Sequence, residues 1–288
     1  MNPPSWREHP VVFDCEGCRL IGIVTLPETP AAAGVIIVVG GPQYRAGSHR
    51  QFTLLARHLA GQGIASIRFD YRGMGDSEGA MRNFEEVDAD IRAALDTLQQ
   101  HAPKLRRIAL WGLCDAASAA LYYAHTDARV TSLVLLNPWV HTPAGAARAR
   151  LKHYYLVRLI QPSFWSKLLS GKIKVRESTQ AIMSATQATA ADTPTNPRHG
   201  GPGYIARMLE GLQRFRGEIL FILSGKDMTA AEFIALSAQN KQWKKSYSSP
   251  KISTTTVKGA NHTFAMREWR KQVESHTAHW LNKQHPNR

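Results

Sequence analysis

The sequence predicts an α/β protein: a mostly parallel central sheet with helices on both faces and an inserted helical cap. The run GVIIVVGG (34–41) is continuous and β-rich, and RVTSLVLLN (129–137) is rich in aliphatic residues; both are typical of strands buried on both faces. Segments with helical spacing lie between such runs, and this alternation predicts parallel strands joined by helices. The alternation stops after residue 139 and resumes at residue 217.

The predicted elements follow one another in a regular order. VVFDC and CRLIGIVTL form an opening hairpin, with Glu16 and Gly17 as its two-residue turn. Further strands are expected at 34–41, 64–70, 106–112, 129–137, 218–225 and 251–259. A helix that stops at glycine is expected at 51–63, and one with acids in its first turn at 83–101. A third helix should follow the strand at 106–112 and run to about residue 126. Two more are expected at 229–242 and 263–283. Residues 1–139 and 217–288 would form the core, and residues 140–216 the cap over the carboxyl edge of the sheet.

Composition and charge exclude several classes of protein. The chain has 288 residues, 43% of them hydrophobic, and a net charge of +14. Residues 142–216 hold 12 Lys or Arg and 3 Asp or Glu, so most of the excess lies in the cap, and no nucleic-acid-binding motif accompanies it. We therefore expect an anionic substrate or peripheral contact with an anionic membrane rather than nucleic acid; a solvated basic face is the alternative.

The apolar runs are short and the cysteines few. Every apolar run is much shorter than the length of about 20 residues that crosses a bilayer, and MNPPSWREHPVVF lacks the apolar region of a secretory signal. A cytoplasmic location is therefore expected. Cys15 and Cys18 form a CxxC with no second ligand pair, which favours the hairpin over a metal site. Neither a metal nor a cofactor is predicted, and the oligomeric state cannot be read from the sequence.

The third cysteine, Cys114, stands at the tip of a predicted strand–turn–helix in RRIALWGLCDAASAALYYA. Gly112 and Ala116 are the small residues that let a strained turn close around a nucleophile. The helix start that follows would lower the pKa of the thiol. The alternative is a small buried cysteine packing a strand–helix joint.

Two further residues complete a nucleophile–acid–histidine order. Asp227 follows a strand in LSGKDMTA, and His262 follows the last strand in VKGANHTF. The carboxyl ends of parallel strands gather at one edge of a sheet, so these residues should meet Cys114 there. Asn137, after the preceding strand, is the rival to Asp227 and would make a Cys-His-Asn set.

These residues predict acyl chemistry. His262 would take the proton of Cys114, and Asp227 would hold the imidazole tautomer. The oxyanion would bind the backbone N–H groups of Asp115 and Gly41, with Gln43 in reserve because Pro42 has no N–H. The candidates for contacting substrate are Tyr44, Arg45, Asn137 and Trp139.

With these motifs in place, the chain resembles the α/β-hydrolase superfamily over nearly its whole length. FDYRGMGDSEG (69–79) is a signature similar to one recurrent there, and the resemblance implies that Asp70 and Arg72 brace its loop. GGPQYRAGSHRQF, FDYRGMGDSEG and WGLCDAASAA together resemble the first hydrolase subfamily associated with exosortase A systems. That resemblance implies a setting in bacterial exopolysaccharide biosynthesis and protein sorting.

The chain departs from the superfamily pattern at two places. Gly40-Gly41 stands where most of the superfamily has His-Gly, and Cys114 stands where most has serine. In having a cysteine at this turn, the chain is similar to dienelactone hydrolase. Because a thiolate is both a good nucleophile and a good leaving group, thioester exchange or acyl transfer competes with ester hydrolysis. We expect an esterase or thioesterase with a covalent acyl-enzyme, acting in exopolysaccharide or lipid metabolism. The alternatives are an acyltransferase on the same triad and a non-catalytic scaffold that docks through its basic cap.

Overall fold

A twisted, mostly parallel sheet organises the computed structural model, which describes residues 6–41, 43–140 and 203–283. The described residues form eight strands in the order β1-β2-β4-β3-β5-β6-β7-β8. β1 and β2, and β2 and β4, pair antiparallel, while the remaining neighbours are parallel. The strands are β1 (Trp6–Cys15), β2 (Cys18–Pro27), β3 (Ala33–Val38), β4 (Ile64–Phe69), β5 (Arg107–Leu113), β6 (Val130–Leu136), β7 (Glu218–Ser224) and β8 (Ile252–Val257).

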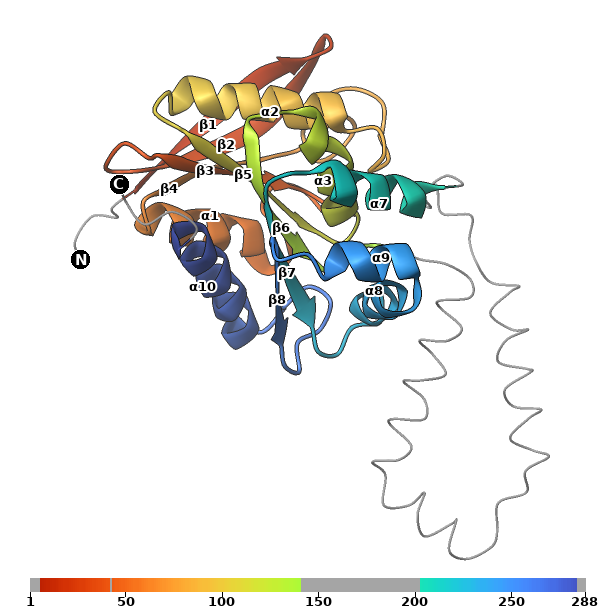
Figure 1. Cartoon of the computed structure of the whole chain (residues 1–288). Helices are drawn as coiled ribbons and strands as arrows, with labels where there is room; N and C mark the ends of the chain where they lie inside the picture. The colour runs from red at the N-terminus through yellow and green to blue at the C-terminus, as the bar shows by residue number, and fades with distance from the viewer. Residues whose placement is uncertain (1–5, 42, 141–202, 284–288) are drawn as a thin grey trace, which may run out of the picture. The chain divides into compact units, whose positions relative to one another are not determined.

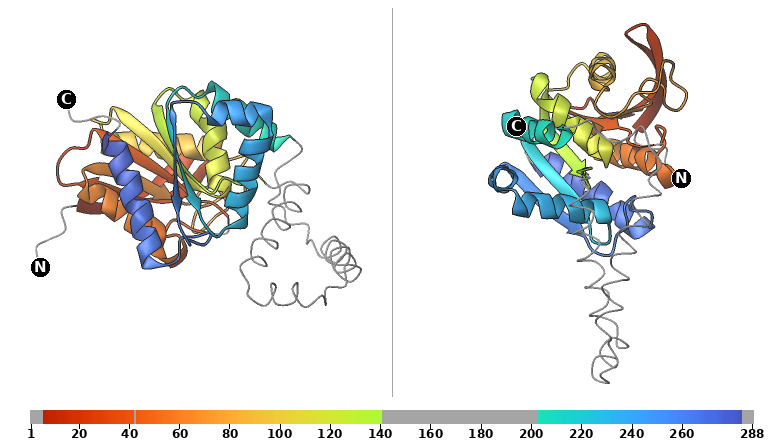
Figure 2. Two further views of the ribbon diagram at one scale, coloured as in Figure 1. Left: turned by 60° about the horizontal axis from the view of Figure 1, so that its bottom comes forward. Right: turned by 90° about the vertical axis from the view of Figure 1, so that its right-hand side faces the viewer.

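Helices cover both faces of this sheet, as predicted (Figures 1 and 2). The α1 and α10 helices lie side by side on one face, and α2 and α3 lie on the other (Figure 1). The α-helices are α1 (Gln51–Gly61), α2 (Asp88–His101), α3 (Asp115–Tyr123), α7 (Tyr204–Arg214), α8 (Met228–Gln239), α9 (Lys241–Tyr247) and α10 (Arg267–Lys283). Two single 3₁₀ turns, η1 (Ser48–Arg50) and η2 (Ala124–Thr126), flank α1 and α3.

The opening hairpin and the buried strands match the sequence prediction. Cys15 and Cys18 face each other across the two-residue turn, where Glu16 has φ 51° and Gly17 φ 80°. Positive φ at both positions suits the right-handed twist of a hairpin. Every residue of β4 is buried, as are most of β3, β5 and β7, so continuous apolar runs correctly indicated strands covered on both faces.

Two predicted helices differ from the observed ones for local reasons. The segment expected as one helix over 229–242 is divided into α8 and α9 at Asn240. The Asn240 side chain accepts the N–H groups of Gln242 and Trp243, and so caps a new helix instead of continuing the old one. Before α2, Asn83 accepts the N–H of Glu85 in a turn, so that helix begins at Asp88 rather than at 83.

The predicted boundary of the cap at residue 216 is wrong. Helix α7 packs against α3, where Tyr122 donates its hydroxyl to the Tyr204 carbonyl at 3.1 Å. The approach is so close that a Cβ on Gly211 would lie 2.0 Å from the Leu121 carbonyl oxygen. The core therefore resumes by Tyr204 rather than at residue 217. The rest of the predicted cap, residues 141–202, lies outside the described residues.

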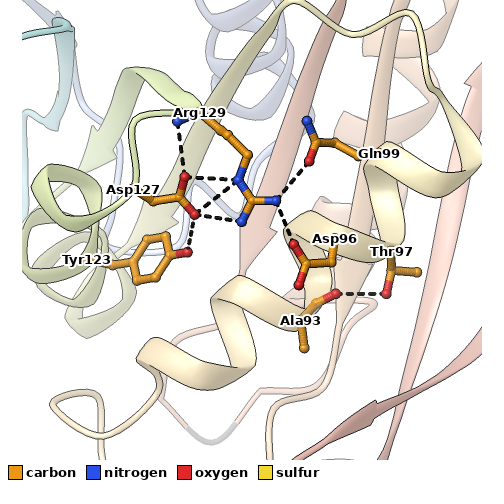
Figure 3. Close-up of polar contacts among 7 residues, drawn as sticks. All are labelled: Ala93, Asp96, Thr97, Gln99, Tyr123, Asp127 and Arg129. Atoms are coloured by element: carbon orange, nitrogen blue, oxygen red, sulfur yellow. Dashed lines mark hydrogen bonds and ion pairs between the residues drawn. The ribbon is translucent and has the colours of Figure 1, made fainter.

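An ion cluster joins α2 to the connection between α3 and β6 (Figure 3). Arg129 donates to Asp127 at 2.7 and 2.9 Å and to Asp96 at 2.6 Å. The Tyr123 hydroxyl donates to the same Asp127 carboxylate at 2.6 Å, and Gln99 accepts a further bond from Arg129 at 2.8 Å. These donors hold the pKa of Asp127 well below its usual range, chiefly through the Arg129 hydrogen bonds. The cluster therefore ties α2 to the C-terminal end of α3 and to the residues that precede β6.

Candidate active site

Cys114 occupies the turn between β5 and α3 in a strained conformation, with φ 64° and ψ −123°. A non-glycine residue adopts this region rarely, and the surrounding backbone must enforce it. Its N–H bonds to the Leu136 carbonyl at 2.9 Å, and its carbonyl accepts the Trp139 N–H at 3.2 Å. A Cβ on Gly112 would lie 2.5 Å from the Ala116 carbonyl oxygen, so only glycine fits there. The structure thus has the strained strand-to-helix turn that the sequence predicted.

Cys114 is half-buried, and its surroundings disfavour the thiolate form. Burial of the thiol raises its pKa well above the usual range, the Asp115 and Asp227 carboxylates raise it further, and a hydrogen bond from the Asp115 backbone N–H lowers it. The expectation that the helix start would lower this pKa is therefore wrong. Desolvation and the two carboxylates raise the pKa more than the Asp115 N–H lowers it, so a thiolate here would need a base to remove the proton.

Asp227 and His262 form a hydrogen-bonded pair at the carboxyl edge of the sheet. His262 Nδ1 lies 3.0 Å from Asp227 Oδ2, with side-chain exposures of 35% and 8% respectively. Asp227 also caps α8 by accepting the Ala230 N–H at 3.0 Å, which fixes the carboxylate. Because Nδ1 faces the carboxylate, Nε2 is the ring nitrogen left to exchange a proton with a nucleophile.

The rival acid, Asn137, has a different place in the structure. It is fully buried, with φ 43°, and its Nδ2 donates to Ser224 Oγ at 2.8 Å and to the His262 carbonyl at 3.1 Å. Its Oδ1 accepts the Ser224 N–H at 2.8 Å. His262 Nδ1 bonds to Asp227 rather than to Asn137, which favours the Cys-His-Asp set, and the Asn137 side chain is fully buried. Asn137 instead anchors the backbone of the histidine loop to β7, a role the sequence reasoning missed.

The loop after β3 contains Gly41 and Gln43, the residues that were expected to supply an oxyanion donor. The Gly41 N–H donates to the Asp115 carboxylate, at 2.8 Å to Oδ1 and 3.0 Å to Oδ2. Gln43, the reserve donor, uses its side-chain oxygen to accept the Ser48 N–H at 3.0 Å and the Gln51 amide at 3.2 Å. The Asp115 side chain therefore holds the N–H that was assigned to an oxyanion, a contact that the spacing of the residues did not reveal.

The remaining candidates for substrate contact differ in exposure. Arg45 forms ion pairs with buried Asp70 and with Asp76, the latter at 2.7 Å, so its guanidinium braces the loop of the FDYRGMGDSEG motif. Tyr44 is 51% exposed. The half-buried Trp139 accepts the Ser118 hydroxyl at its carbonyl, at 3.0 Å. Structural bonds occupy Arg45, while Tyr44 offers an exposed ring beside the loop.

The bracing that the resemblance implied for Arg72 is present. The backbone N–H of Arg72 donates to the buried Asp90 carboxylate at 2.8 Å, and its guanidinium donates to the same carboxylate at 2.9 Å. The guanidinium also forms an ion pair with Glu16. Among the described residues, no cluster of three or more metal-ligating side chains occurs. Within the same residues, no helix has both the length and the apolar composition that a membrane span requires.

A mostly parallel sheet, a strained strand-to-helix turn at Cys114 and a bonded aspartate–histidine pair at the carboxyl edge together indicate an α/β-type hydrolase. The profile of the Alpha/beta hydrolase family matches residues 35–275, and the chain belongs to that family. Among curated proteins it is similar to a quorum-quenching protein, AidA, of Acinetobacter baumannii, with 27% identity over 45% of this chain and 43% of that protein. It is also similar to a polyketide transferase of Penicillium sp, with 28% identity over 33% of each chain. The chain thus spans less than half the length of these curated relatives.

Solved structures show the same fold. An esterase of Pyrococcus furiosus superposes with a TM-score of 0.64 at 15% identity, over 97% of this chain and 91% of that one. A dienelactone hydrolase of Anabaena variabilis superposes with a TM-score of 0.60 at 13% identity, over 97% and 98% respectively. At such identities the likeness concerns the fold.

Proposed function

We propose that the protein is an acyl hydrolase, an esterase or thioesterase, with Cys114 as nucleophile, His262 as general base and Asp227 as the acid that orients the imidazole. The observation that carries this proposal is the placement of the three residues at the carboxyl ends of β5, β7 and β8, with the His262–Asp227 bond at 3.0 Å. A scaffold without catalysis would have no need of a buried carboxylate on an imidazole, which argues against the non-catalytic alternative.

The reaction proceeds in two halves. His262 Nε2 takes the thiol proton, and the sulfur forms a bond to the carbonyl carbon as the carbonyl oxygen becomes an oxyanion held by the Asp115 N–H. Collapse of that intermediate expels the alcohol or thiol, which takes the proton from His262. Water then attacks the thioester of the acyl-enzyme, giving the acid and restoring the thiol.

Acyl transfer is the second candidate, and the cysteine itself favours it. A thioester acyl-enzyme reacts readily with amines and thiols as well as with water, so the acceptor decides the product. The similarity to a protein named as a polyketide transferase is in keeping with that reactivity. A neutral or anionic small-molecule acyl donor is proposed for both candidates. A setting in exopolysaccharide or lipid metabolism rests on the resemblance to the exosortase-associated subfamily alone.

Intact-protein mass spectrometry tests the proposal. Brief exposure to p-nitrophenyl acetate is expected to add one acetyl group to the wild type and none to Cys114→Ala. Cys18→Ala is the matched control, because it removes a half-buried free thiol outside the site and should still be acetylated. His262→Gln should slow acetylation on the order of 10²–10⁴-fold, the usual contribution of a general base. Acetylation of Cys114→Ala at the wild-type rate would refute the nucleophile.

The same acyl-enzyme distinguishes hydrolysis from transfer. Decay in buffer alone gives the rate of hydrolysis, and decay with a thiol or amine acceptor gives the rate of transfer. Equal decay rates with and without acceptors identify a hydrolase, whereas decay only when an acceptor is present identifies a transferase.

A further inference from the structure

The Asp115 side chain spans the gap between the nucleophile turn and the loop after β3. Both of its carboxylate oxygens accept the Gly41 N–H, at 2.8 and 3.0 Å, and Oδ1 also accepts the Ala116 N–H at 2.9 Å. Asp115 is the first residue of α3, next to Cys114. The carboxylate therefore rests against the donor that an oxyanion on the substrate would need.

The neighbouring backbone leaves room for this arrangement. A Cβ at Gly40 would lie 2.4 Å from Asp115 Oδ1 and 2.6 Å from the Leu113 carbonyl oxygen. Atoms cannot approach so closely without displacement, so any side chain at position 40 would push the carboxylate away from Gly41. At Gly41, with φ 60°, no described atom outside the two neighbouring residues lies within 4 Å of a Cβ position.

This contact has two chemical consequences. A single N–H that is bonded to a carboxylate cannot at the same time stabilise an oxyanion, and the negative charge repels the charge that develops on the carbonyl oxygen. The same carboxylate raises the pKa of the Cys114 thiol, together with burial and the Asp227 carboxylate. In this state one oxyanion donor is occupied, and the carboxylate disfavours the thiolate form of Cys114.

We propose that Asp115 masks the oxyanion hole of the substrate-free protein, and that its carboxylate must leave the Gly41 N–H before the tetrahedral intermediate can form. This inference rests on the proposed function, and it makes Asp115 a positioning residue that acts through Gly41 and Cys114. Displacement of the carboxylate becomes a step of the catalytic cycle, so removing the mask should accelerate turnover rather than slow it.

Asp115→Ala and Asp115→Asn separate the mask from a structural brace. Alanine frees the Gly41 N–H, and with p-nitrophenyl acetate we expect kcat to rise about 10-fold, because a hydrogen bond to a charged group no longer has to be broken. Asparagine keeps an acceptor near Gly41 but removes the charge, so its kcat should rise less. Asp88→Asn is the matched control: it removes a charge at the first residue of α2, away from the site, and should leave kcat unchanged.

A second measurement is independent of ester turnover. The pH dependence of Cys114 alkylation by iodoacetamide reports on the thiol, whose pKa is raised by the carboxylates of Asp115 on α3 and of Asp227, which is bonded to His262. Both Asp115 variants should shift the alkylation curve to lower pH, and Asp88→Asn should not. All of these variants are made in a protein that also carries Cys18→Ala, because the half-buried Cys18 thiol could otherwise react with iodoacetamide.

The outcomes are distinct. A lower kcat in both Asp115 variants with an unshifted alkylation curve would overturn the inference and identify a structural brace. If Asp115→Ala fails to fold, Asp115→Asn decides alone: a kcat at or below wild type, or an unshifted curve, overturns the inference. Failure of the proposed function would appear separately, as acetylation that does not depend on Cys114.

Discussion

Replacing Asn137 should destabilise the protein by an amount that its contacts define. Its amide makes three buried hydrogen bonds, to Ser224 Oγ at 2.8 Å, to the His262 carbonyl at 3.1 Å and from the Ser224 N–H at 2.8 Å. At about 1 kcal/mol for each bond, Asn137→Gly should lower the free energy of unfolding by roughly 3 kcal/mol. Because residue 137 has φ 43°, Asn137→Ala should cost about 1 kcal/mol more than glycine.

Urea denaturation at pH 7 measures the free energy of unfolding of both variants, which is the product of the midpoint and the slope. A fall of roughly 3 kcal/mol corresponds to a decrease in Tm of about 6–12 °C for a domain of this size. Asn240→Ala is the matched control, because it removes a helix-capping asparagine outside the site and should cost about 1 kcal/mol. A second readout follows because Asn137 anchors the His262 carbonyl. At temperatures well below the Tm of Asn137→Gly, its kcat should still be lower than that of the wild type. A loss under about 1 kcal/mol in Asn137→Gly, or equal stability of the two variants, would refute this reasoning.

Three further predictions follow from other contacts. Gly112→Ala should prevent formation of the nucleophile turn, because its Cβ would lie 2.5 Å from the Ala116 carbonyl oxygen; soluble yield and acetylation should both collapse. Arg72→Met should destabilise by about 3–5 kcal/mol in urea, since it leaves the fully buried Asp90 carboxylate without its guanidinium. Asp127→Asn should lower the free energy of unfolding at pH 7, but the difference from the wild type should shrink in acid. The folded-state pKa of Asp127 is depressed, so the stabilisation by its carboxylate is fully present above the unfolded pKa of about 3.9. That stabilisation is lost as the pH falls through the folded-state pKa. Urea midpoints at pH 7, 3.5 and 2.5 check this, and a deficit that does not depend on pH would contradict it.

Much of the fold could be predicted because its signals are local. The strands β3 to β7 appear as short apolar runs, the hairpin as Glu16-Gly17, and the nucleophile turn as small residues around Cys114. The family relation extends over residues 35–275, in agreement with the resemblance drawn from the motifs. Helix boundaries were predicted less well, because an asparagine such as Asn240 can cap a new helix or continue an old one, and hydropathy does not distinguish the two.

The candidate site divides in the same way. The order of Cys114, Asp227 and His262 along the chain, each after a strand, was enough to bring them to one edge of the sheet, because parallel strands share that edge. Chain order could not decide which partner each polar group would take. Asn137 was read as a rival to Asp227, but the structure gives its amide to Ser224 and to the His262 carbonyl.

The sequence by itself therefore determined the class of fold, the order of its strands along the chain and the residue types at the nucleophile turn, since each depends on periodicity and steric needs within a few residues. Only the tertiary structure decided that the Asp115 carboxylate meets the Gly41 N–H, 74 residues away, and that burial and nearby carboxylates raise the pKa of the Cys114 thiol. Hydrogen bonds and pKa values depend on the distances and burial that folding creates between residues remote in sequence. No local pattern encodes them.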